Sequence, residues 1–194
     1  MYNFDEKNLV VQLAATTQIA KTGFALSVAT RLLPMYVEYT KMAKIELNSL
    51  PSSCVGTLWD IAISARIHQM DEVETASNTL LNLMPGDNDP WNEYHPLAED
   101  AIAAIVYALR SYLTNDPQEA AWAARRSYEA ADQFAIRQLD IDFQDKGVEH
   151  TLLSHPIVQQ ELMRQNRDLE LAIIGDIGTL RAISATESLL VLGK

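Results

Sequence analysis

The sequence has little cysteine, little glycine and few positive charges, and these shortages exclude several classes of protein. Its single cysteine, Cys54, cannot form a disulfide within the chain and has no CxxC partner for a zinc site, which favours a reducing compartment and predicts a cytoplasmic protein. There is no run of roughly 18 apolar residues, so we expect no membrane span. Fifteen Lys and Arg against 26 Asp and Glu give a net charge of −11, which repels phosphate backbones and predicts no nucleic-acid partner.

The common signatures of catalysis and cofactor binding are missing as well. The chain contains no GxxxxGK[ST], GxGxxG, HExxH or Glu-x-x-His pattern. The stretch DNDPWNE, which begins at Asp87, resembles the start of a calcium loop but lacks the glycine and the glutamate that such a loop needs further along. The sequence therefore identifies no catalytic residue and leaves any cofactor unknown.

What is present predicts an all-α fold. Only seven glycines occur, alternating β-branched runs are few, and Ala, Leu, Gln and Glu are abundant. We expect one compact helical domain over residues 1–194, with about seven to nine helices built from antiparallel hairpins. The expected helices cover 5–18, a segment through Ala25 that Pro34 breaks, 35–47, 53–68, a helix from Asp71, one from His95, one from Asp116, and 154–175. The tail, 172–194, is expected to dock on the bundle or on a second copy.

Two acidic stretches predict helix starts. In NDPQE, Asp116 is a favourable N-cap, Pro117 suits the first helical position, and Glu119 suits the third. Asp71 and Glu74 have the spacing in which each side chain satisfies a free backbone N–H at the start of a helix. These residue types therefore have a structural explanation that needs no chemistry.

Trp122 does not fit the small-residue face that its helix is expected to bury. It projects on the polar side of the helix, near Arg126 and Ile136. A large aromatic residue in this place needs a cover, which is either a terminal segment of the same chain, as we favour, or a partner subunit. Trp122, Arg126 and Ile136 are thus the predicted interface. The leading hypothesis is a cytoplasmic helical interaction or structural protein that self-associates as a homo-oligomer, its other protein partners being unknown.

The part of the chain between Arg66 and Arg110 contains no Lys or Arg, although it includes His68 and His95. Eight acids fall inside it: Asp71, Glu72, Glu74, Asp87, Asp89, Glu93, Glu99 and Asp100. This base-free window is the most polarised part of the chain.

Five residues are candidates for a metal site: His95, Glu99, Asp100, Glu129 and Asp132. His95 and Glu99 are four residues apart and share a helix face. Two carboxylate pairs, Asp71 with Glu74 and Glu129 with Asp132, have the spacing with which all-helical nucleotide pyrophosphatases hold Mg²⁺. The alternative hypothesis is accordingly a divalent-metal-dependent phosphohydrolase of the nucleotide pyrophosphatase type. Helix caps and solvated helix faces explain the same acids and are favoured.

Cys54 lies near an expected helix start, where a thiol can become reactive, but a small packing residue is the favoured interpretation. A third hypothesis is a bundle that binds a small ligand. It predicts an apolar pocket with one or two convergent polar groups.

Between Trp91 and Phe134 the chain contains, in this order, LAEDA, an apolar helix that ends at Leu113, and DPQEAAWAAR with a following Tyr. This segment resembles the family called domain of unknown function 416, also known as YjaG-like. RLLPMYVEY and HPIVQQELMRQ are further similar segments, so the resemblance covers about residues 5–171. It implies a compact all-helical fold and a bacterial cytoplasmic protein, and it supplies no activity, substrate or catalytic residue.

Overall fold

The structure is a computed structural model that describes residues 1–64, 70–139 and 147–189. Within these ranges the chain is all-α, as predicted, with nine helices and no strand; the helical content is 79%. The helices are α1 (Glu6–Ala14), α2 (Gln18–Ala43), α3 (Leu50–Ser64), α4 (Met70–Leu81), α5 (His95–Thr114), α6 (Pro117–Gln138), α7 (Val148–Ser154), α8 (Pro156–Ile174) and α9 (Ile177–Ser184). His68 lies outside the described residues.

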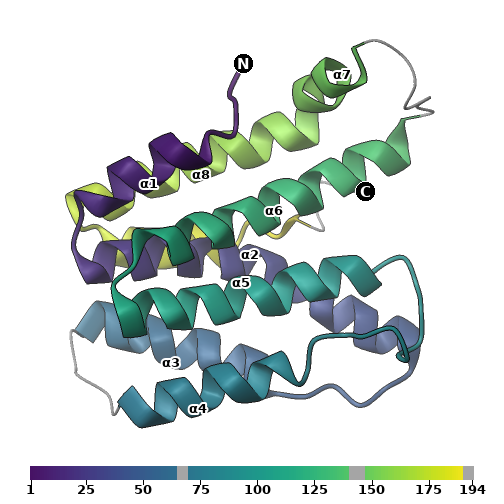
Figure 1. The fold of residues 1–194 in the computed structure, drawn as a ribbon, viewed down its shortest axis with the longest axis horizontal. Coiled ribbons are helices and arrows are strands. Elements are labelled where there is room, and N and C mark those ends of the chain that lie inside the picture. Colours follow the sequence, from purple (N-terminus) through teal and green to yellow (C-terminus); the bar gives the residue numbers. More distant parts are fainter. Residues whose placement is uncertain (65–69, 140–146, 190–194) are drawn as a thin grey trace.

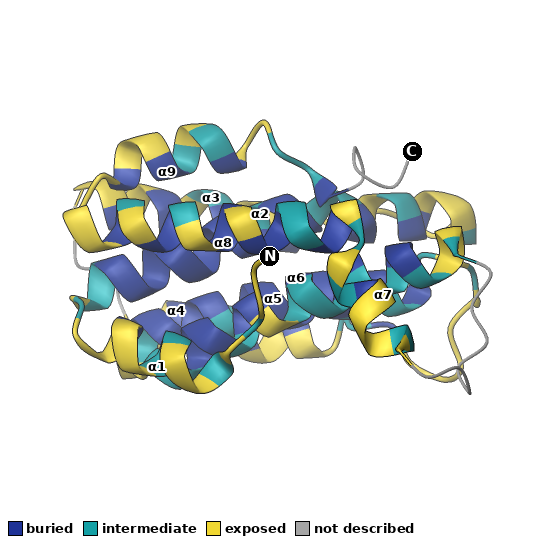
Figure 2. Cartoon of the chain, turned by 90° about the horizontal axis from the view of Figure 1, so that it is seen from above, coloured by how far each residue is buried: buried dark blue, intermediate teal, exposed yellow. Residues whose placement is uncertain are grey.

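The helices α2 and α5 form the centre of the bundle and make its most extensive contact (Figure 1). On one side of this pair α6 packs against both helices, and α8 and α1 pack against α6. On the other side α3 packs on α2, while α4 lies on α5. In Figure 2 the outer helices α1 and α7 are largely exposed, because each buries only one residue fully, Leu13 and Leu152.

Small residues let the central helices approach closely. Ala101, Ala104 and Ala108 of α5 are completely buried, and so is Ala25 of α2. Gly23 of α2 has the same role towards α9, because a Cβ at this position would lie 3.0 Å from Cδ1 of Ile177. A side chain at this position would therefore require Ile177 to shift by a few tenths of an ångström.

The prediction that Pro34 ends a helix is wrong. Pro34 lies inside α2, which runs for 26 residues, so the separate helix expected over 35–47 does not exist. A proline in a helix interior loses one backbone hydrogen bond and costs about 3 kcal/mol. Burial of Met35, Tyr36 and Tyr39 in the turns beyond it offsets that cost. The helix expected over 5–18 is also shorter, because Thr17 caps α2 by accepting a hydrogen bond from the Ala20 N–H at 3.1 Å.

The start of α6 is confirmed in part. Asp116 is the N-cap, its carboxylate accepting from the Gln118 N–H at 2.9 Å, and Pro117 is the first helical residue. Glu119 does not reach back to the cap, because it is buried and pairs with Arg110 at 3.0 Å. The capping pair predicted at Asp71 is wrong too, since α4 already begins at Met70.

The described part of the tail docks on the bundle. Asp176 caps α9, accepting from the Thr179 N–H at 3.1 Å, and Ile177 and Leu180 are buried against α2 and α8. Leu189 is buried as well. No helix among the described residues is long and apolar enough to cross a membrane.

Candidate functional site

The predicted metal ligands fall into two groups on α5 and α6. His95 is buried at the start of α5, where its Nε2 lies 3.2 Å from the Gly86 carbonyl and its Nδ1 lies 3.6 Å from Glu99. Its ring packs edge-on against Tyr39 of α2, with the centroids 5.5 Å apart. Through these contacts His95 holds residues 82–94, which connect α4 to α5, against the bundle.

Asp100 and Glu129 are brought together, with an arginine between them. Arg126 lies 3.4 Å from Asp100 and 3.1 Å from Glu129, and Gln133 donates to the second oxygen of Asp100 at 3.3 Å. Burial raises the pKa of Asp100 to about 7, although Arg126 acts in the opposite direction. Burial also raises the pKa of Asp132, with Glu129 adding to the effect.

The geometry of Asp100, Arg126 and Glu129 is that of an ion-pair cluster. Across the described residues, no group of three or more His, Cys, Asp and Glu side chains is placed to hold an ion. The Arg126 guanidinium occupies the position between the carboxylates, where a metal would have to lie.

The structure places the predicted interface residues on the outer side of α6. Trp122 is half-buried and packs against Tyr107 of α5, with ring centroids 5.5 Å apart. Arg126 is engaged with the two acids just described, and Ile136 packs against the core. Trp122 thus has a contact within its own chain, from Tyr107 of a central helix. Its contact with a partner stays a prediction.

A more exposed apolar surface lies where α2 ends, and the sequence patterns did not indicate it. Trp91 is 76% exposed, the highest value among the large hydrophobic residues described. Its ring rests on His95 at 4.6 Å. Asn92 donates to the Tyr39 carbonyl at 3.4 Å, which ties this connection to the last turns of α2 (Figure 1). We call the exposed residues of this region, Met42, Ile45, Leu47 and Trp91, the apolar end.

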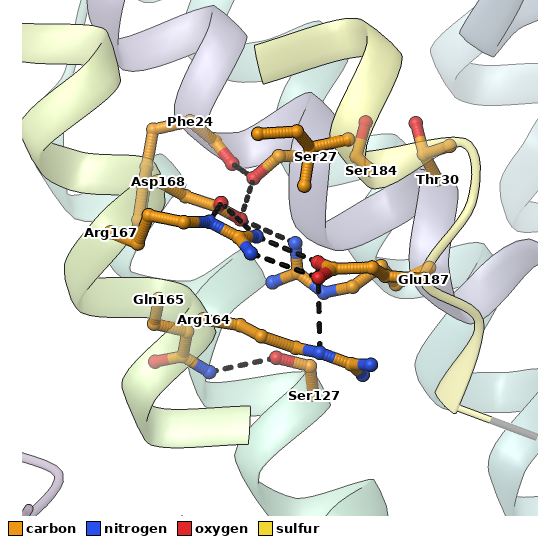
Figure 3. A network of polar contacts seen from close by, with 12 residues as sticks. Phe24, Ser27, Thr30, Ser127, Arg164, Gln165, Arg167, Asp168, Ser184 and Glu187 are labelled. Carbon is orange, nitrogen blue, oxygen red and sulfur yellow. Dashed lines mark hydrogen bonds and ion pairs between the residues drawn. The ribbon is translucent and has the colours of Figure 1, made fainter. Parts of the chain in front are cut away.

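A buried network of charges joins α2, α6 and α8 (Figure 3). Arg31 is fully buried; it pairs with Glu161 at 3.0 Å and with Asp168. The hydroxyl of Ser127 donates to Glu161 at 2.7 Å, and that of Ser27 donates to Asp168 at 2.8 Å. Burial alone would lower the pKa of Arg31, but the two carboxylates outweigh it and raise the pKa, so the guanidinium stays charged.

The network extends towards the segment after α9. Arg167 pairs with Asp168 and with Glu187, each at 2.7 Å, and Figure 3 shows Glu187 facing both Arg164 and Arg167. Arg164 lies 3.6 Å from Glu187, and burial lowers its pKa. The positive charges of three arginines thus equal the negative charges of three carboxylates, which is typical of a structural cluster. The residues are Arg31, Arg164, Arg167, Glu161, Asp168 and Glu187.

An apolar cavity of about 190 Å³ lies between α3 and α4, above α5. Its lining includes Cys54, Leu58 and Ile61 of α3 and Val73 of α4. Burial raises the pKa of the Cys54 thiol, which favours the packing role predicted for it over a reactive one. The cavity is separate from both the buried network and the apolar end.

Comparisons with known proteins agree on one family. The family described as "Protein of unknown function (DUF416)" matches residues 8–181, which reaches beyond the similarity seen in the sequence and into α9. A crystal structure of a DUF416 family protein from Shewanella baltica OS155 superposes with a TM-score of 0.80 at 19% identity, over 93% of this chain and 95% of that chain. At this identity the likeness shows the fold alone. No curated protein matches.

Proposed function

The chain belongs to the DUF416 family, which is described only as a protein of unknown function, and we therefore propose a function from its own surface. The protein acts as a helical interaction protein of the bacterial cytoplasm and pairs with a second copy through the apolar end. The free, buried Cys54 supports a reducing compartment.

The exposure of Trp91 carries this proposal. A tryptophan that is 76% exposed gains little from its own fold, yet its ring is held against His95 rather than left free. Such a preformed aromatic anchor loses little conformational entropy on binding, and Trp is enriched among the residues that dominate interface energies. Met42 and Leu47, both about half exposed, extend the apolar area around it.

The charges around the apolar end support a second copy as the partner. Lys44 is exposed just after α2, between the acids Glu38 and Glu46, and Glu38 pairs with Lys41 at 3.3 Å; the connection that carries Trp91 exposes Asp87, Asp89 and Glu93. In a two-fold contact Lys44 of each copy faces the acidic connection of the other, so this charge pair makes the surface complementary to itself. A surface that carried charges of only one sign would repel a second copy of itself.

We expect Trp91→Ala to weaken the dimer at least tenfold, because truncating a central anchor costs about 2 kcal/mol or more. Sedimentation velocity over a range of micromolar concentrations measures the effect. Trp122→Ala is the matched control, since this aromatic residue is covered by Tyr107. A larger effect of Trp122→Ala would move the interface to α6, and a wild-type chain that stays monomeric would refute self-association.

A charge exchange tests the two-fold geometry separately. Lys44→Glu and Glu93→Lys should each weaken the homodimer, because like charges then face each other twice. An equimolar mixture of the two variants should recover association, since both charge pairs are restored in the heterodimer. Failure of the mixture to recover would show that these residues do not face each other.

A further inference from the structure

The cavity between α3 and α4 exists because α4 packs mainly on α5 and touches α3 much less. Its floor is formed by the buried side chains of Cys54, Leu58, Ile61, Val73 and Leu109. No charged group lies among these floor residues. A cavity with such a floor is poorly hydrated and favours an apolar occupant.

The mouth of the cavity has a different chemistry. Glu72 at the start of α4 lines it together with the exposed Ser53 and Thr57 of α3, and among the residues that the structure describes no lining residue is basic. Asp71 lies beside Glu72 on the adjoining surface of α4. The α4 side of the mouth falls within the base-free window of the sequence, so the field of these two acids attracts cations and repels anions.

We propose that this cavity binds a small apolar amine, with a benzene-sized group on the floor and a protonated amine at Glu72. A cavity of about 150 Å³ accommodates benzene, and the 190 Å³ found here leaves room for a short linker to the mouth. The hydroxyls of Ser53 and Thr57 supply acceptors for the remaining N–H groups. A ligand of the same size that carried a carboxylate in place of the amine would be repelled by Glu72, because both groups are negatively charged.

Cys54 allows a direct test, because it is the only thiol in the chain and lines the cavity floor. The probe is phenethylamine, and the readout is the rate at which iodoacetamide alkylates Cys54 in the native protein. For a ligand of this size we expect a dissociation constant on the order of 1 mM. At ten times that concentration, the occupied cavity should slow alkylation about tenfold.

Matched ligands and variants separate the two parts of the site. 3-Phenylpropionate, with a carboxylate in place of the amine, should protect Cys54 at least tenfold less well. Glu72→Gln should weaken phenethylamine about threefold, as expected for a partly exposed ion pair. Glu74→Gln, on the exposed side of the same helix, should leave the affinity for phenethylamine unchanged.

Filling the cavity tests the apolar part. Ala76→Phe places a ring in the cavity and should abolish protection, whereas Asn78→Phe on the exposed face of α4 should leave it intact. Trp91→Ala should not alter protection, which keeps this site distinct from the dimer contact. If phenethylamine at about ten times the expected dissociation constant gives no protection, or if the carboxylate protects equally well, the assignment is wrong.

Discussion

Arg31→Met is expected to lower the free energy of unfolding by about 3–5 kcal/mol, because it leaves Glu161 and Asp168 charged and buried without their central partner. Urea denaturation followed by far-ultraviolet circular dichroism measures the change. Most of the lost stability should come from Glu161, because Asp168 keeps its ion pair with Arg167 at 2.7 Å.

Two further variants identify the cause of this loss. Arg31→Met combined with Glu161→Gln removes the orphaned charge and should recover part of the stability. Arg125→Met removes an arginine that is about half exposed and pairs with Glu129, so it should cost no more than about 1 kcal/mol. Equal losses for Arg31→Met and Arg125→Met would show that the buried network does not stabilise the fold.

The buried network explains how α2, α6 and α8 find one alignment. Apolar side chains pack in several registers at similar free energy, but the Arg31 guanidinium has to meet Glu161 and Asp168 at once. Gln165 adds a second link, donating to the Ser127 hydroxyl at 2.8 Å and to the Ala124 carbonyl at 3.0 Å. A slip by one helical turn would leave all of these groups unpaired, so the network selects the register that the apolar core alone does not.

Local rules were enough to predict much of the fold from the sequence. Asp116 and Pro117 start α6 as expected, and Gly175 ends α8 in the left-handed conformation that favours glycine. Each of these features depends on residues within one turn of the helix end. The all-α class follows from the same kind of information, summed over the chain.

Features that depend on distant residues were missed. In α8 the apolar residues Val158 and Leu162 are buried, whereas Ile173 of the same helix is about half exposed. Glu161 and Asp168, which a helical pattern assigns to water, are completely buried. Their partner Arg31 lies more than a hundred residues earlier, and no local pattern indicates such a pairing. Pro34 was misjudged for the same reason, because the packing that keeps α2 intact is tertiary.

The candidate sites likewise combine features that local sequence predicts with features that depend on tertiary packing. The sequence placed Asp100 and Glu129 among the possible ligands, but it did not show that Arg126 would lie between them. It singled out Trp122 because of its helical phase, whereas the exposed Trp91 lies in a connection, where periodicity carries no information. The α3–α4 cavity depends on how one helix tilts away from another, which is also a tertiary property.

Asp100→Asn is expected to stabilise the protein at neutral pH. The pKa of Asp100 rises from 3.8 to about 7 on folding, chiefly through burial, and this difference corresponds to about 4 kcal/mol. Because the folded-state pKa is the higher one, the native state keeps the proton that the unfolded chain has already released. The favourable contribution of the protonated carboxyl is therefore complete below about pH 4 and is lost as the pH rises towards 7.

The neutral amide that replaces the carboxyl in this variant does not titrate, but its oxygen can still accept the hydrogen bond from Gln133. The gain in unfolding free energy over the wild type should therefore be small at pH 4 and grow to a plateau of up to about 4 kcal/mol above pH 7. Urea denaturation of both proteins at pH 4, 5.5, 7 and 8 measures this difference. A gain that does not change with pH, or a loss at pH 8, would mean that the ion pair with Arg126 outweighs the cost of burying the Asp100 carboxylate.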